Sequence, residues 1–159
     1  MGTKTEALAA QFEGKARDAM ATLEGLSDTH WKKVTEAEKW PVGVTAHHLA
    51  GALEAVSGLV TALANGQPPG GLSVDMLNEM NARHAREFAQ CTKAETIELH
   101  RRGTATAAAT IRGLRDDQLA RSGVVLAGLP PMSAEQLIQR GLLDHVDEHF
   151  GSIRRTIDR

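Results

Sequence analysis

Apolar residues recur at helical spacing through most of the chain, and this periodicity predicts an all-α fold. Residues 3–26 carry small or apolar side chains at intervals of three or four positions, namely Leu8, Phe12, Ala16, Ala19 and Leu23. This spacing places them on one face of an α-helix, and such a face needs a partner to bury it. Similar patterns predict further helices over residues 42–64, 73–89, 92–114 and 133–156.

Local signals at the ends of these segments support the boundaries. Three segments open with Ser or Thr followed three positions later by Glu or Gln: Thr3 to Glu6, Thr92 to Glu95 and Ser133 to Gln136. This pattern predicts a capping box, in which two side chains satisfy free backbone N–H groups. Asn65-Gly66 predicts a helix end, and the Pro- and Gly-rich residues 67–71 predict a loop.

Four long helices and a shorter one favour a four-helix up-and-down bundle as a single domain over residues 1–159. A longer irregular connection, which contains Pro130-Pro131, precedes the last helix. The alternative architecture is a bundle with a long crossover through residues 115–132.

Composition excludes several classes of partner and chemistry. The net charge is −2 and basic residues form no block, so we expect no nucleic-acid partner. No apolar run reaches membrane-spanning length and the N-terminus does not resemble a signal peptide, so we expect no membrane partner. The single cysteine, Cys91, excludes an intramolecular disulfide and favours a cytoplasmic location. Tyrosine is absent, which excludes a tyrosine acid or oxyanion donor.

His145 and His149 form an H-x-x-x-H pair in the last predicted helix. Four residues make about one helical turn, so both imidazoles project from the same side. Apolar residues lie on or beside that side, namely Ile138, Leu142, Val146 and Ile153. Neutral imidazole is the commonest protein metal ligand, so the pair suggests a divalent metal. The alternative is two core histidines satisfied by Asp144, Glu148 or backbone carbonyls.

Helical periodicity selects His48 rather than His47 as a third ligand on another helix. The neighbours of His48 at helical spacing are Val44, Ala52, Ala55 and Leu59, whereas those of His47 are Gly43, Gly51, Glu54 and Gly58. His48 therefore borders the buried face, while His47 faces a smaller, more polar side and could line the mouth of a pocket.

The other histidines have weaker assignments. His84 shares a helical face with Leu77, Met80 and Phe88, which predicts that it points inward. A hydrogen-bonded core histidine is the favoured interpretation of His84, and a substrate contact or alternative ligand is the second. His30 and His100 have polar neighbours, so we expect both to face solvent.

Two motifs resemble the DinB/YfiT-like family of metal-binding four-helix bundle proteins. Residues 40–50, from Trp40-Pro41 to His47-His48-Leu49-Ala50, are similar to the W-[ST]-V-x(5)-H-L-A helix start of that family. Residues 145–153 are similar to its H-x-x-x-H-x-G-Q-I ending. Two departures are Pro41, in place of a small polar residue, and Ser152, in place of glutamine.

Three imidazoles leave a coordination position open on Zn²⁺ or Ni²⁺, where water or a thiol can bind. The resemblance implies the thiol: relatives include S-transferases and isomerases that use mycothiol, bacillithiol or glutathione. We therefore expect His48, His145 and His149 to hold a metal that activates a low-molecular-weight thiol against a small electrophile. His47 and His84 are candidate substrate contacts.

Several alternatives stay open. The chain could be a metal-dependent hydrolase or a non-catalytic metal-binding stress-response module. Residues that orient the imidazoles would more plausibly come from another helix than from Asp144, Asp147 or Glu148, and no carboxylate is assigned as a general base. The resemblance is also compatible with a homodimer.

Overall fold

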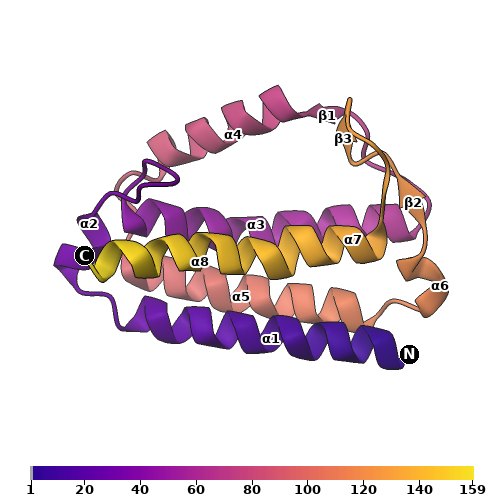
Figure 1. Ribbon diagram of the computed structural model, residues 1–159, viewed down its shortest axis with the longest axis horizontal. Helices are drawn as coiled ribbons and strands as arrows, with labels where there is room; N and C mark the ends of the chain where they lie inside the picture. Colours follow the sequence, from indigo (N-terminus) through magenta and orange to yellow (C-terminus); the bar gives the residue numbers. More distant parts are fainter. Residues whose placement is uncertain (1) are drawn as a thin grey trace.

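The structure is a computed structural model that describes residues 2–159, and it is mostly helical (Figure 1). This confirms the all-α class. The long helices are α1 (Thr3–Glu24), α3 (Val42–Ala64), α5 (Lys93–Arg112) and a continuous last helix made of α7 (Ala134–Ile138), the π-helical segment η1 (Gln139–Leu143) and α8 (Asp144–Ile157). Shorter elements are α2 (Asp28–Lys32), α4 (Val74–Glu87), α6 (Asp116–Leu119), and the strands β1 (Leu72–Ser73), β2 (Ser122–Gly123), β3 (Leu126–Ala127) and β4 (Met132–Ser133).

The order of helix directions differs from the predicted up-and-down bundle. Helices α3 and α5 run in the same direction, and α4 returns the chain between them (Figure 1). Contacts keep the same order along both helices. Glu54 Oε1 of α3 accepts from Arg102 Nε of α5 at 3.0 Å. Beyond the ends of α3 and α5, Asn65 Oδ1 accepts from Gln118 Nε2 of α6 at 3.3 Å. The alternative, a long crossover through residues 115–132, is not seen either: these residues stay at one end of the molecule and join α5 to α7 (Figure 1).

The core lies between the long helices. The five predicted core residues of α1 are all buried, and Phe12, Ala19 and Leu23 have no exposed surface. Gly103 allows α3 and α5 to approach closely, because a Cβ there would lie 2.9 Å from Leu53 Cβ and 3.0 Å from the Ala50 carbonyl oxygen. No helix among residues 2–159 combines the length and apolar character that a membrane crossing requires.

Two of the three predicted capping boxes are confirmed. Thr92 and Ser133 each accept from the backbone N–H three residues on, and Glu95 and Gln136 complete the boxes. The prediction at Thr3 was wrong, because Thr3 is already helical and Gly2 is the N-cap without a side-chain cap.

Helix α4 does not bury the predicted apolar face. Met80 is 51% exposed and Phe88 is 38% exposed, and none of the residues of α4 is buried. The prediction that Leu77, Met80 and Phe88 point into the core was therefore wrong. The physical reason is that α4 arches over the outside of α3 rather than packing inside the bundle (Figure 1).

Candidate metal centre

Three partly buried histidines from two helices converge between α3 and α8. His48 lies on α3, and His145 and His149 lie one turn apart on α8. One ring nitrogen from each lies within 4.8 Å of the other two. The ring centroid of His48 is 5.6 Å from that of His145 and 5.0 Å from that of His149. The structure thus brings together the three predicted ligands, which we call the histidine triad.

Hydrogen bonds orient the two rings on the last helix. His145 Nδ1 lies 3.2 Å from the Gly141 carbonyl oxygen, and His149 Nδ1 lies 2.8 Å from Glu38 Oε2. Both partners are acceptors, so each Nδ1 carries the hydrogen and donates it. In the neutral ring, Nε2 then keeps its lone pair, which is the state that a metal ligand needs.

The environment also favours neutral imidazoles. Burial, together with His149, His145 and His84, lowers the pKa of His48 to about 3. Burial and the nearby His149 lower the pKa of His145 to about 4. Both rings are therefore uncharged near neutral pH. Neutral nitrogen donors suit Zn²⁺ and Ni²⁺, so this donor set fits the predicted metals.

These lowered pKa values predict an acid-sensitive fold. The histidines have an ordinary pKa near 6.5 when unfolded, so below about pH 6.5 the unfolded chain binds more protons than the folded one. Stability is then lost as pH falls through this range. We expect the metal-free protein to unfold at progressively lower urea concentration between about pH 6.5 and about pH 4.5.

A variant of His48 provides the control for this pH dependence. His48→Gln lacks one of the titrating rings, so its stability should fall less steeply over the same range. Equal stability of the wild-type protein at about pH 7 and about pH 5 would contradict the prediction.

Glu38 is a site residue that the sequence analysis missed. It lies in the loop between α2 and α3, and its side chain is only 8% exposed. Besides the bond to His149, its Oε1 accepts from Ser152 Oγ at 2.6 Å. Burial alone would raise the pKa of Glu38, but hydrogen bonds from Ser152 and His149 hold it below its ordinary value.

Asp144 and Asp147 of the last helix, which were judged the less plausible orienting residues, have other partners. Asp144 accepts from Gln139 and Asp147 pairs with Lys15, both at exposed positions. The carboxylate that orients a triad ring is that of Glu38, which lies in a loop rather than on another helix. Helical periodicity does not describe a loop, so it gave no signal for Glu38.

His47 and His84 form a second cluster beside the triad. His47 Nδ1 and His84 Nε2 lie 2.7 Å apart, and Phe88 stacks on His47 at a centroid distance of 4.3 Å. The ring of His84 lies 5.7 Å from that of His48. Burial, with His47 nearby, lowers the pKa of His84 to about 4. The predicted hydrogen bond of His84 is thus present, with His47 of α3, but His84 is half-buried on α4 rather than in the core.

His47 is more buried than the sequence indicated. It is only 7% exposed, because His84 of α4 and Phe88, which caps the end of α4, cover the side of α3 that was expected to be more polar. Its pKa is lowered by burial, although the pKa of His48 is lowered further. A role of His47 and His84 in substrate binding stays a prediction.

The expectation that His100 faces solvent was wrong, since this residue is 1% exposed. Its Nε2 lies 3.0 Å from the Ala16 carbonyl oxygen, and its ring meets Phe150 edge-on at 5.9 Å. The polar sequence neighbours of His100 lie on other faces of α5. The ring itself points toward α1. His30 caps α2, where its Nδ1 accepts from Ser27 N.

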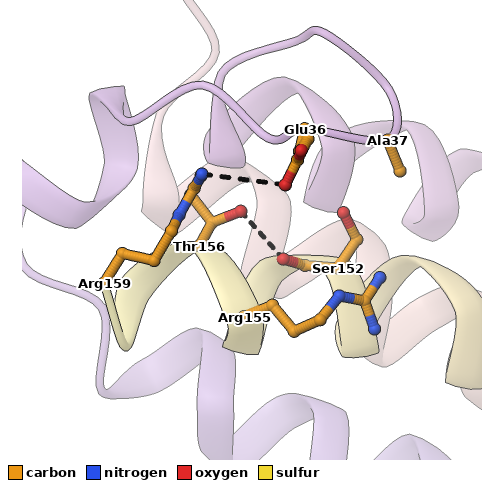
Figure 2. Close-up of a pocket in the computed structure, with 6 residues that line it drawn as sticks. All are labelled: Glu36, Ala37, Ser152, Arg155, Thr156 and Arg159. Carbon is orange, nitrogen blue, oxygen red and sulfur yellow. Dashed lines mark hydrogen bonds and ion pairs between the residues drawn. The ribbon is translucent and has the colours of Figure 1, made fainter.

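Two cavities lie near this region, but neither is lined by the histidine triad. One of about 270 Å³ lies against the end of α8 beside the α2–α3 loop (Figure 2), and its lining residues are Glu36, Ala37, Ser152, Arg155, Thr156 and Arg159. The other, of about 360 Å³, is lined by Trp31, Lys32, Pro41, Val44, Ala89, Gln90 and Cys91. Ser152 therefore lies between Glu38 and the first cavity.

Comparison with solved structures identifies a shared fold. A mycothiol-dependent maleylpyruvate isomerase superposes with a TM-score of 0.73 at 16% identity, covering 94% of this chain and 60% of the other. A variant of such an isomerase, with one histidine changed to alanine, gives a TM-score of 0.68 at 18% identity, covering 96% and 65%. The chain thus spans less than two thirds of these isomerases.

A third solved structure matches over nearly the full length of both chains. It is described as a sibling lethal factor precursor, DfsB, and superposes with a TM-score of 0.73 at 18% identity, covering 98% of this chain and 95% of that one. Identities this low show the fold alone.

Sequence comparison is more specific about the family. A search of curated proteins finds none that matches this sequence. The family model described as the mycothiol maleylpyruvate isomerase N-terminal domain matches residues 12–146. This match includes His48 and His145 and ends before His149. Because it spans most of the chain, the protein belongs to the mycothiol maleylpyruvate isomerase N-terminal domain family.

Proposed function

We propose that the protein is a metal-dependent enzyme of the thiol S-transferase type that uses a low-molecular-weight thiol. The observation that carries this proposal is the convergence of three imidazole nitrogens within 4.8 Å. Family membership supports a thiol as the cosubstrate, since the solved isomerase is described as mycothiol-dependent.

His48, His145 and His149 would hold Zn²⁺ or Ni²⁺. Three protein ligands with an open position are typical of catalytic zinc sites, whereas structural sites are usually closed by four ligands. When bound, such an ion lowers the pKa of a thiol at the open position and so favours the nucleophilic thiolate.

The thiol must come from outside the chain. Cys91 is the one cysteine, and its Sγ lies 3.5 Å from the Gly43 carbonyl oxygen. Burial raises the pKa of the Cys91 thiol, which disfavours its thiolate. A small-molecule thiol is therefore the better nucleophile.

The polar groups around the triad favour thiol transfer over hydrolysis. A metal-dependent hydrolase commonly uses a carboxylate as general base. The carboxylate that contacts the triad is Glu38, and both of its oxygens are already engaged, by His149 and Ser152. His47 and His84 lie beside His48 and are the candidates for contact with the small electrophile.

An activity assay tests this proposal. Protein purified without a histidine tag is incubated with a chlorodinitrobenzene electrophile, with and without mycothiol, bacillithiol or glutathione. We expect conjugate formation that requires a thiol, disappears after chelation and returns with Zn²⁺ or Ni²⁺. Enzyme that contains metal but forms no conjugate with any of these thiols would contradict the transferase proposal. Thiol-independent, metal-dependent cleavage of an ester would identify a hydrolase.

One observation favours a non-catalytic alternative. The solved structure that matches over nearly the full length of both chains is described as a lethal factor precursor rather than as an enzyme. In that case the metal would only tie α3 to α8. Metal would then raise the unfolding temperature without supporting turnover.

A further inference from the structure

The loop that carries Glu38 is held in a defined conformation. Thr35 N donates to the Trp40 carbonyl oxygen at 2.8 Å, and Val34 and Pro41 form an isolated antiparallel bridge. Lys39, next to Glu38, has a φ of 63°, and it is the one non-glycine residue with positive φ among residues 2–159. Such a conformation costs free energy and persists only where surrounding contacts fix it.

The buried carboxylate of Glu38 contacts one turn of α8. Its two oxygens accept from His149 Nδ1 at 2.8 Å and from Ser152 Oγ at 2.6 Å. Within the described chain, no Lys or Arg forms an ion pair with it. Burying a carboxylate is costly unless hydrogen bonds compensate it. These two bonds therefore account for the position of Glu38.

From this arrangement we propose that Glu38 is a positioning residue for His149, and that the Ser152 hydroxyl positions Glu38. A neutral imidazole exchanges its hydrogen between two ring nitrogens. The Glu38 carboxylate favours the hydrogen on Nδ1 of His149, which leaves the Nε2 lone pair free. The inference rests on the proposed metal centre for its purpose, because that lone pair is what a metal would bind.

Ser152, which completes this contact, departs from the family pattern quoted above. It stands where the DinB/YfiT-like pattern has glutamine, and it is 2% exposed. Its hydroxyl donates to Glu38, while the residue itself borders the cavity in Figure 2. The serine at this position and Glu38 in the loop therefore act as a pair.

Nitrogen NMR of the histidine rings in the metal-free protein tests the tautomer directly. We expect His149 of the wild-type protein to carry its hydrogen on Nδ1. Glu38→Ala should shift the population toward the other tautomer, and Glu38→Gln, which retains an acceptor oxygen, should restore Nδ1–H in part. The inference is overturned if His149 has the same tautomer in wild type and Glu38→Ala, or if wild type carries the hydrogen on Nε2.

Glu36→Ala is the matched control from the same loop. Glu36 points toward Arg159 across the cavity (Figure 2), and its side chain is 84% exposed. This variant should leave the His149 tautomer unchanged. If Glu38→Ala does not fold, Glu38→Gln and Ser152→Ala still test the inference, since each should change the ring-nitrogen shifts of His149.

Zn²⁺ affinity, measured by competition with a chromophoric chelator, provides the second readout. We expect Glu38→Ala to weaken binding by about 10- to 100-fold. Ser152→Ala should weaken it less, and should have no further effect once Glu38 is alanine. Affinity unchanged in Glu38→Ala would overturn the inference and leave the proposed function standing. Absence of Zn²⁺ binding in wild type would refute the proposed function, while the NMR result still decides the role of Glu38.

Discussion

Replacing His48 by alanine should abolish tight binding of Zn²⁺. His48 supplies the α3 side of the triad, so its removal leaves two imidazoles on one turn of α8. Loss of a direct ligand should exceed the loss of about 10- to 100-fold expected for an outer-shell partner. Competition with a chromophoric chelator measures the affinity. The rise in unfolding temperature that Zn²⁺ gives the wild-type protein should also disappear.

Two other histidines serve as controls for this variant. His30 caps α2, so His30→Ala should bind Zn²⁺ as the wild type does. His47→Ala tests the choice of ligand on α3, because His47 precedes His48 but bonds to His84. The triad would be refuted as the metal site if His48→Ala bound as tightly as wild type, or if His47→Ala lost binding and His48→Ala did not.

Phe150→Ala should cause the largest loss of folding stability among the variants proposed for this protein. The Phe150 ring has no exposed surface and lies in the core against His100. Replacing a buried phenylalanine with alanine costs about 3 to 5 kcal/mol, because the lost burial and the remaining cavity both oppose folding. For a domain of this size the unfolding temperature should fall by roughly 6 to 20 °C. Urea or thermal unfolding of the metal-free protein measures the effect.

Phe88→Ala is the matched control, because it removes the same side chain from a surface position. Phe88 is 38% exposed at the C-terminal end of α4, where it stacks on His47. We expect a loss of no more than about 1 kcal/mol, near the range of surface substitutions. Equal losses in the two variants would mean that Phe150 does not contribute to the core as the structure indicates.

Periodicity predicted well those features that depend on one helix at a time. It placed Phe12 and Leu23 in the core, and both are fully buried. It also selected His48, and the structure brings that residue to His145 and His149. Whether the triad holds a metal stays a prediction. Such features are accessible because a helix fixes which residues share a face.

Features that depend on how segments meet were not accessible in this way. His100 has charged sequence neighbours, yet its ring points toward α1, because α5 packs against α1 and the sequence alone does not reveal that contact. The exposed apolar side of α4 has the same periodicity as a buried one, so the sequence did not distinguish them. Glu38 lies in a loop, and its contact with His149 spans more than a hundred residues of sequence.

The π-helical segment Gln139–Leu143 has a consequence for the orientation of the ligands. The buried residues Ile138, Leu142, Val146 and Phe150 follow one another at intervals of four. In a regular α-helix each interval of four overshoots a full turn by about 40°, so this row would drift around the helix by about 120°. A π-turn holds more residues per turn and takes back part of that rotation. The wider turn just before His145 therefore sets the rotational phase at which both α8 imidazoles meet His48.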